Sequence, residues 1–453
     1  MTRTLIGELA AHIGEAVSIE GSVDVARNQG KMAFFDFRDR TGTVQGVVFG
    51  KPDVLAIAQA LRQEWVVRIA GVVNERPEKM RRDVPNGSIE LEITAIEVLA
   101  EADAMPFDTD AELNIDTMMD NRPLTLRRPR ERAIFRIQAE IVRAYRDFLN
   151  GEGFTEFQAP KFVGDDAEGG GNVFRVEYFK DKSAYLATSP QLYKQIMVGV
   201  FERVFAVGNV FRAEKHATTR HLNEYTSLDI EMGFIEDHTT VMALEERFMR
   251  FLAERLRERC AADFAALGAE IPRFADSEIP RLKLREAQAL ISKETGVDCT
   301  AEPDLEPEHE RWLCEWAKKE HGSDFVFITH YPVSKRPFYT YEDEADPGFT
   351  KSFDLLFRGV EITTGGQREH RYDELIRKLE AKGLKPENFQ FYLMAFKYGM
   401  PPHGGWGMGL ERLTQKLIGL DNVKEATLFP RDMNRIDVLL STADVPAESG
   451  ETD

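Results

Sequence analysis

Cysteine is scarce in this chain. Its 453 residues include three cysteines, Cys260, Cys299 and Cys314, which are far apart and form no Cys-X-X-Cys pair. This excludes a disulfide framework and a zinc site built from cysteines. The scarcity fits a reducing compartment, and we expect a cytoplasmic protein.

Long apolar runs are also lacking. No stretch approaches the ~20 residues that span a bilayer, and the first apolar segment contains charges and no small-residue cleavage site. We therefore expect neither a membrane span nor a secretory leader. With 43% hydrophobic and 30% charged residues, the composition is that of a folded protein, and the length predicts two or three domains.

Positive charge is in deficit. The chain has 58 lysines and arginines against 77 acidic residues, a formal charge of −19. Such a surface repels a polyanion as a whole. Any nucleic-acid partner must be held by local basic patches and specific contacts, and the acidity by itself indicates solubility.

Residues 1–104 contain five short segments rich in Val, Ile and Phe, and turn signals at 28–30, 41–42 and 85–87 separate them. The only helical pattern covers residues 52–62, between the third and fourth segments. Five strands with one helix in that place are typical of an OB-type (oligonucleotide-binding) β-barrel.

The rest of the chain has a different pattern. Residues 105–130 contain three prolines and an arginine-rich end, and we expect a linker there. Residues 131–440 alternate helices with long, alternating strands, beginning with a helix over 131–150. This favours an α+β domain with an antiparallel sheet flanked by helices. Residues 441–453 are predicted to be a disordered acidic tail.

The first segment with chemical content covers residues 204–235. Arg212 and Glu214 are two apart and are predicted to share one face of a strand. The next strand is predicted to place Ser227, Asp229 and Glu231 on one face and apolar residues on the other. A face with charges of both signs is either a solvated surface or an anion-binding floor.

The second segment is glycine-rich. Gly404, Gly405, Gly407 and Gly409 precede an amphipathic helix. Glycines let the backbone approach a ligand closely, and a helix start favours negative charge. The segment lacks the lysine and hydroxyl residue of a P-loop and the context of a dinucleotide-binding fold, which argues against both nucleotide-binding modes.

Together these segments resemble motifs of the class II aminoacyl-tRNA synthetases. FRAEKHATTRHLNEYTSLDIEM resembles motif 2, GMGLERL resembles motif 3, and GFTEFQAPKF resembles motif 1. The N-terminal barrel selects the aspartyl, asparaginyl and lysyl subgroup. AEGGGNVF (167–174), TSPQLYKQ (188–195) and residues 351–373 look like the archaeal and eukaryotic type of aspartyl enzyme.

The resemblance implies an activity and its partners. The expected reaction activates L-aspartate with ATP to aspartyl-adenylate and transfers it to the 3′ end of tRNA-Asp, with Mg²⁺ as cofactor. Whether tRNA-Asn is charged as well is left open. A homodimer with Pro160 of motif 1 at its interface is implied, and neither DNA nor a membrane is an expected partner.

The resemblance also implies the residues that bind ATP. Arg212 and Arg412 are the expected catalytic cations, one on each side of the nucleotide. The other expected ATP-binding residues are Glu214, Arg220, His221, Leu222, Glu361, Gly409, Leu410 and Glu411. Glu361 and Thr364 match the Mg²⁺ ligands. Residues three apart in a strand point to opposite faces, so the strand must end or bulge there, and Gly365-Gly366 is the expected place.

The amino-acid site is implied in the same way. Lys194 and Arg368 are expected to bind the β-carboxylate of aspartate, and two fixed cations disfavour a neutral asparagine side chain. The remaining expected aspartate-binding residues are Glu168, Ser189, Gln191, Arg212, Asp229 and Thr364. Gln191 and Lys194 are three apart, hence on one face of a helix that starts at Ser189-Pro190.

In the barrel, the resemblance assigns anticodon contacts to Arg27, Phe34 and Gln45. Phe34, Phe35 and Phe37 cannot all face one way, so one face of their strand is aromatic and open to ligand. Ser22 and Asp24 depart from the family pattern, which leaves the choice between tRNA-Asp and tRNA-Asn undecided.

Three alternatives remain at this point. The nearest is asparaginyl specificity, against which Lys194 and Arg368 argue. An ammonia-dependent asparagine synthetase on the same catalytic fold is disfavoured by the N-terminal barrel. A catalytically idle RNA-binding paralogue is disfavoured by the presence of Arg212, Glu361 and Arg412.

Overall fold

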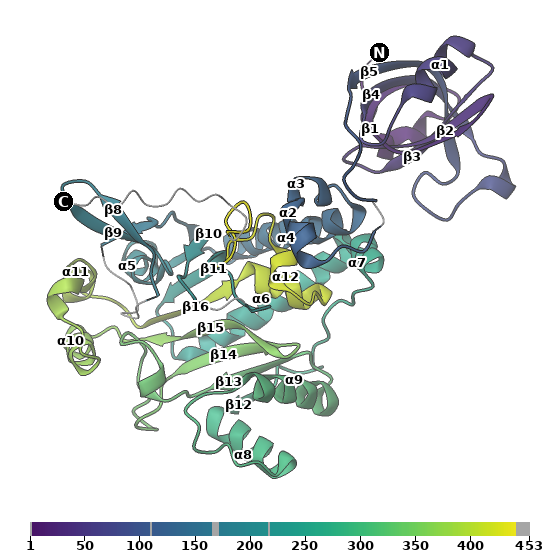
Figure 1. Cartoon of the computed structure of the whole chain (residues 1–453). Helices are drawn as coiled ribbons and strands as arrows, with labels where there is room; N and C mark the ends of the chain where they lie inside the picture. Colours follow the sequence, from purple (N-terminus) through teal and green to yellow (C-terminus); the bar gives the residue numbers. More distant parts are fainter. Residues whose placement is uncertain (1, 109–110, 165–171, 216–217, 441–453) are drawn as a thin grey trace. The chain divides into compact units, whose positions relative to one another are not determined.

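The computed structural model describes the chain except for residues 1, 109–110, 165–171, 216–217 and 441–453. Its contacts divide the chain into two units, residues 1–112 and 113–453 (Figure 1). Glu168 and the expected tail over 441–453 lie outside the described residues. Within the described ranges, no helix has the length and apolar character needed to cross a bilayer.

The first unit is a closed five-stranded barrel with strand order β1-β2-β3-β5-β4. Its strands are β1 (Ala16–Gln29), β2 (Met32–Arg38), β3 (Thr43–Phe49), β4 (Val66–Glu75) and β5 (Ile89–Ala100). Helix α1 (Pro52–Ala60) joins β3 to β4, and short 3₁₀ turns cover Ile6–His12 and Glu78–Met80. The predicted barrel with one helix in this position is confirmed.

The second unit is built on an eight-stranded sheet in the order β12-β13-β14-β15-β16-β11-β10-β6 (Figure 1). The bounds are β6 (Thr155–Glu156), β10 (Arg203–Phe211), β11 (Glu224–Gly233), β12 (Arg281–Lys283), β13 (Phe325–Thr329), β14 (Ser352–Phe357), β15 (Val360–Arg368) and β16 (His403–Gly409). The central pairs are antiparallel, as predicted, but the outermost pairs β12–β13 and β10–β6 are parallel, so the sheet is mixed. A small sheet holds β7 (Phe162–Val163), β8 (Arg175–Tyr178) and β9 (Lys182–Leu186).

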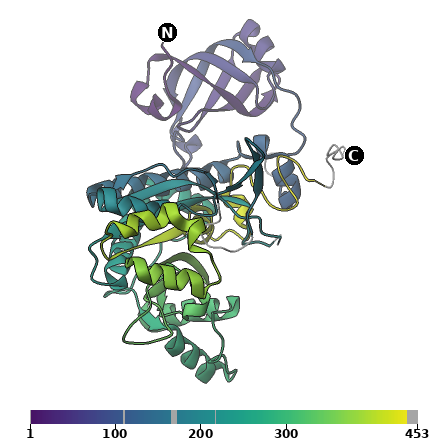
Figure 2. The same ribbon diagram turned by 90° about the vertical axis from the view of Figure 1, so that its left-hand side faces the viewer.

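Helices cover this sheet (Figures 1 and 2). They pack in three hydrophobic clusters. The first cluster contains α4 (Pro129–Gly151), α6 (His238–Arg259), α7 (Ala261–Leu267) and α12 (Leu410–Ile418). The second contains α5 (Gln191–Phe201), α10 (Tyr372–Ala381) and α11 (Gln390–Lys397), and the third contains α8 (Leu284–Thr295) and α9 (Pro307–His321). In α4 the helical spacing of Ile134, Ile137 and Ile141 turns all three inward, and each is fully buried.

The expectation of a linker over 105–130 is wrong for its second half. Helices α2 (Ile115–Asp120) and α3 (Arg122–Thr125) and the start of α4 lie there, within the second unit. Arg122 is buried, and its guanidinium donates to the carbonyl oxygens of Thr427 (2.7 Å) and Leu428 (2.8 Å). The arginine side chain thus ties this segment to residues far away in sequence, which composition alone does not reveal.

Candidate active site

A cavity of about 380 Å³ lies on the sheet and is lined by residues of β11, β14, β15 and β16. Most of the expected substrate-binding residues line it. They are Ser189, Gln191, Arg212, Glu214, Arg220, His221, Leu222, Asp229, Glu361, Thr364, Arg368, Gly409, Glu411 and Arg412. Lys194 and Leu410 are not in its wall.

Helix α5 starts as predicted. The Ser189 hydroxyl accepts a hydrogen bond from the backbone nitrogen of Gln191 at 3.1 Å, and Gln191 and Lys194 are both buried on one face of the helix. Lys194 lies beneath the cavity floor. Its Nζ donates to Asp229 Oδ1 at 2.9 Å and to the carbonyl oxygen of Trp406 at 2.8 Å. Asp229, its partner, lines the cavity, and the expected contact of Lys194 with the β-carboxylate stays a prediction.

Glu231 is the residue that sequence reasoning missed. It is fully buried between the two expected cations, with Oε1 accepting from Arg368 Nε at 3.0 Å and Oε2 lying 3.6 Å from Lys194 Nζ. Its place on the polar face of β11 was predicted, but no role was attached to it. Two cations and two carboxylates, counting Asp229, thus form one buried and charge-compensated cluster.

Arg368 brings this cluster to the cavity. Its Nη2 donates to the carbonyl oxygen of Gly405 at 2.9 Å, and its guanidinium lies 5.6 Å from the centre of the Tyr339 ring. No residue in the described part of the chain accepts a hydrogen bond from Nη1. The guanidinium is therefore fixed on two sides and offers one nitrogen to a ligand in the cavity.

The strand that carries Arg212 is shorter than predicted. β10 ends at Phe211, and Arg212 follows it in a loop. The Asn223 side-chain amide donates to the carbonyl oxygen of Arg212 at 2.7 Å, and the guanidinium lies 5.8 Å from the Tyr225 ring centre. Arg212 reaches the cavity because these contacts hold the loop, rather than through strand alternation.

Two further residues of this segment carry ion pairs. His221 Nε2 lies 3.3 Å from Glu214 Oε2, and Arg220 Nη2 lies 3.3 Å from Glu310 Oε2. Burial, with Glu361 nearby, raises the pKa of Glu310 to about 7, against the opposing effect of Arg220. This end of the cavity carries charges of both signs.

Glu361 and Thr364, the expected Mg²⁺ ligands, contact each other. The Thr364 hydroxyl donates to Glu361 Oε1 at 2.6 Å. A bulge makes this possible, because Thr363 pairs with Leu355 while Glu361 pairs with the next residue of β14. The extra residue is Ile362, so the irregularity was expected but lies earlier than Gly365-Gly366.

The charge of Glu361 is favoured by its neighbours. Burial alone would raise its pKa, but Arg412, the Thr364 hydroxyl, Arg336 and Arg212 together lower it. Its carboxylate is therefore ionised at neutral pH and is suited to a hard cation. Among the described residues, no group of three His, Cys, Asp or Glu side chains is arranged to hold a metal by itself.

The glycine-rich segment is a central strand, β16, rather than a loop. Gly405 pairs with Glu231, and a β-carbon at Gly405 would lie 2.1 Å from the carbonyl oxygen of Ile230 and 2.5 Å from Glu231 Oε2. At Gly407 a β-carbon would lie 3.2 Å from Asp229 Oδ1. Glycine is needed here because buried carboxylates occupy the side-chain space.

Three expected ATP-binding residues begin the helix that follows. The side chain of Leu410 packs in the hydrophobic core, so its expected nucleotide contact is not made by that side chain. Glu411 accepts the backbone N–H of Thr226 with both oxygens at 3.0 Å, and burial raises its pKa to about 7. Arg412 lines the cavity and donates from Nη1 to the carbonyl oxygen of Glu361 at 2.9 Å.

In the barrel, Phe35 and Phe37 point into the core and stack with ring centroids 5.6 Å apart. Phe34 is partly exposed on the other face, which Gln45 shares. Gln45 is buried, and its Oε1 accepts from Arg76 Nη2 at 3.0 Å. Of the three phenylalanines of β2, Phe34 is therefore the one that faces outward.

Two other barrel residues are held by ion pairs. Arg27, opposite Phe34 in β1, contacts Asp36 at 3.0 Å. Asp24 contacts Arg38 at 2.9 Å. In the second unit, Pro160 is exposed between β6 and β7.

Two family models match the chain. One, tRNA synthetases class II (D, K and N), covers residues 114–433, and the other, an OB-fold nucleic acid binding domain, covers residues 17–99. The chain belongs to the class II tRNA synthetases of the D, K and N group.

Individual proteins within this group are similar to the chain over nearly its full length. The chain is 47% identical to an aspartate–tRNA(Asp/Asn) ligase of Thermus thermophilus, covering 96% of this chain and 99% of the relative. It is 41% identical to an aspartate–tRNA(Asp) ligase of Thermoplasma acidophilum, covering 96% and 100%. Among solved structures, the asparaginyl-tRNA synthetase of Pyrococcus horikoshii with asparaginyl-adenylate gives a TM-score of 0.86 at 30% identity, covering 96% and 99%.

Proposed function

We propose that the protein is an aspartate–tRNA ligase, which activates L-aspartate with ATP and transfers it to the 3′ end of tRNA-Asp. The observation that carries this is the buried cluster at the amino-acid end of the cavity. Arg368 offers Nη1 to a ligand, and Lys194 adds positive charge from beneath Asp229. A side-chain carboxylate is the acceptor that suits this guanidinium nitrogen best, because charge-assisted hydrogen bonds are the stronger ones.

The nearest alternative is asparaginyl specificity, because a structure of that type shares the fold. Specificity for aspartate is supported by the two aspartate–tRNA ligases named above, which are more similar in sequence to this chain than that asparaginyl enzyme is. It is also supported by charge, since the remaining guanidinium nitrogen of Arg368 binds an anionic carboxylate more strongly than a neutral amide oxygen.

Activation joins the α-carboxylate of aspartate to the α-phosphate of ATP and breaks the bond between the α- and β-phosphates, so that pyrophosphate leaves. The nucleophile is already an anion at neutral pH, so no general base is needed, and positioning and charge neutralisation lower the barrier. Arg212 is the clamp for the reacting carboxylate and α-phosphate, and Arg412 holds the nucleotide from the other side. Glu214, Arg220 and His221 complete the nucleotide contacts.

The residues present fit a Mg²⁺ ion. Glu361 and Thr364 supply adjacent carboxylate and hydroxyl oxygens, which suit a hard cation that takes its other ligands from phosphates and water. When bound, the ion neutralises charge on the phosphates.

The barrel would bind the anticodon. Phe34 offers a ring face for stacking, Gln45 an amide and Arg27 a cation on the same surface. Stacking contributes about 1–3 kcal/mol per base and tolerates many bases, so Gln45 supplies selectivity. One of the two relatives is named for both tRNA-Asp and tRNA-Asn, and the other for tRNA-Asp alone. Aminoacylation of separate tRNA-Asp and tRNA-Asn transcripts would show which of these specificities the present protein has.

The proposal also includes a homodimeric assembly and a cytoplasmic location for the enzyme. The exposed Pro160 of motif 1 would lie in the interface of a homodimer, which sedimentation of the wild type against Pro160→Arg tests. A cytoplasmic site of action is supported by the three cysteines, which are free and buried.

Exchange of pyrophosphate into ATP tests the proposed activity. Exchange that depends on aspartate and not on asparagine is expected. Exchange with asparagine alone would establish the asparaginyl alternative. Release of free asparagine from aspartate, ATP and ammonia would indicate an ammonia-dependent asparagine synthetase. No exchange with any amino acid would indicate a catalytically idle RNA-binding paralogue.

A further inference from the structure

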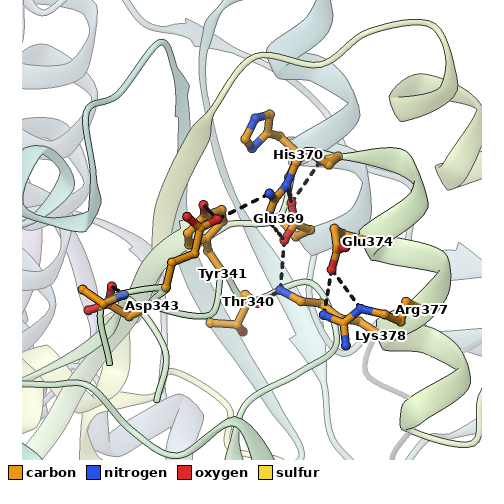
Figure 3. Close-up of polar contacts among 11 residues, drawn as sticks. Thr340, Tyr341, Asp343, Glu369, His370, Glu374, Arg377 and Lys378 are labelled. Atoms are coloured by element: carbon orange, nitrogen blue, oxygen red, sulfur yellow. Dashed lines mark hydrogen bonds and ion pairs between the residues drawn. The ribbon is translucent and has the colours of Figure 1, made fainter. Parts of the chain in front are cut away.

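A second polar cluster lies directly behind Arg368, outside the cavity. Figure 3 shows its centre, the carboxylate of Glu369, which is 1% exposed and immediately follows the last residue of β15. Oε1 accepts the backbone N–H groups of His370 and Arg371, both at 3.1 Å. Oε2 accepts Lys378 Nζ at 3.0 Å. The carboxylate therefore closes the turn after β15.

Lys378 connects this turn to a second segment. It comes from α10, whose Leu375 and Leu379 are fully buried and anchor the helix. Its Nζ also donates to the carbonyl oxygen of Thr340 at 2.9 Å. The buried ammonium of Lys378 thus binds both the Glu369 side chain, directly after β15, and the backbone of Thr340, which lies beside the end of that strand (Figure 3).

The two connected segments are those that hold Arg368. The backbone N–H of Glu369 donates to the carbonyl oxygen of Tyr339 at 2.8 Å, and Thr340 forms a β-bridge with Arg368. Tyr339, whose ring faces the Arg368 guanidinium, lines the cavity, as does Thr340. Glu369 and Lys378 are not in the cavity wall and cannot contact a substrate there.

We propose that Glu369 and Lys378 are positioning residues for the amino-acid site: their ion pair clamps Tyr339 and the end of β15 together and so fixes the direction of the Arg368 guanidinium. The inference rests on the proposed aspartate specificity. Glu369 is ionised over the whole working range, because Arg371 and Lys378 outweigh the effect of burial and hold its pKa at about 2.

The test measures aspartate-dependent pyrophosphate exchange in Glu369→Gln, Lys378→Met and the double variant. Each single change should raise KM for aspartate about tenfold while changing KM for ATP less than about twofold, since small misplacements of a binding group are costly and Arg212 and Arg412 are untouched. The double variant should be no worse than the poorer single one, because no buried charge is left unpaired.

Arg377→Gln is the matched control. Arg377 pairs with Glu374 on the exposed side of the same helix, so its loss removes an ion pair without touching the clamp (Figure 3). Arg377→Gln should leave the KM values for aspartate and ATP unchanged. Lys378→Arg, which keeps the positive charge, should have a KM for aspartate closer to the wild type than Lys378→Met has.

Two results would overturn the clamp. One is a lower melting temperature with KM for aspartate unchanged, which indicates a role in stability alone. The other is an equal rise in both KM values. Failure of the proposed function itself is seen separately, as wild-type protein that does not exchange with aspartate.

Discussion

Removing the Lys194 ammonium is the most direct perturbation of the buried cluster. Lys194 is 1% exposed and neutralises Asp229 and Glu231, so Lys194→Met leaves two carboxylates beneath the site without their shared cation. Breaking a buried pair in this way costs about 3–5 kcal/mol. If that energy appears in aspartate binding, the loss is on the order of a hundredfold to several thousandfold, at about 1.4 kcal/mol per factor of ten.

The assay is pyrophosphate exchange with aspartate varied at saturating ATP, beside a direct measurement of ATP binding and of the melting temperature. Aspartate use should collapse while ATP binding stays measurable, because the nucleotide contacts lie at the other end of the cavity. Lys397→Met, the same change at an exposed lysine of α11, is the control. Unchanged aspartate kinetics in Lys194→Met would refute the assignment.

Three further changes test other parts of the molecule. Thr364→Ala should raise the Mg²⁺ concentration needed for half-maximal exchange, whereas Thr364→Ser should not; equal titrations would remove Thr364 from the cation site. Gln45→Ala should weaken tRNA charging roughly tenfold through one lost hydrogen bond and leave adenylate formation intact, and loss of exchange would contradict the division of labour between the units. Burial raises the pKa of Glu245 from 4.5 to about 8, so its contribution to stability is complete below pH 4.5 and is lost as pH rises through 8. Between pH 6 and 9 the melting temperature should therefore fall more in the wild type than in Glu245→Gln, and parallel curves would disprove this.

The hydrophobic pattern of the sequence was sufficient to predict those helices and strands in which buried residues recur at the regular spacing of the element. The spacing of Ile134, Ile137 and Ile141 predicted α4, and the alternation along residues 224–233 separated its polar from its apolar face. The barrel followed from its turn residues for the same reason, since neighbours in sequence decide these elements.

Contacts between distant segments could not be predicted in this way. Arg122 stands in a segment that is rich in proline and arginine, and only carbonyl groups some 300 residues later make it a buried residue. Glu231 was visible as one more polar residue of its strand, but its role depends on Arg368, 137 residues away. The bulge at Ile362 depends on the register of β14 against β15, which no local signal encodes.

The glycines of β16 have a consequence for engineering the enzyme's amino-acid preference. A methyl group at Gly405 would collide with the backbone carbonyl of Ile230 and with Glu231, and one at Gly407, which lines the cavity, would lie 3.2 Å from Asp229 Oδ1, so β16 leaves little room for a side chain. Variants that accept a bulkier or differently charged amino acid are therefore to be sought at lining residues outside β16, such as Gln191 of α5.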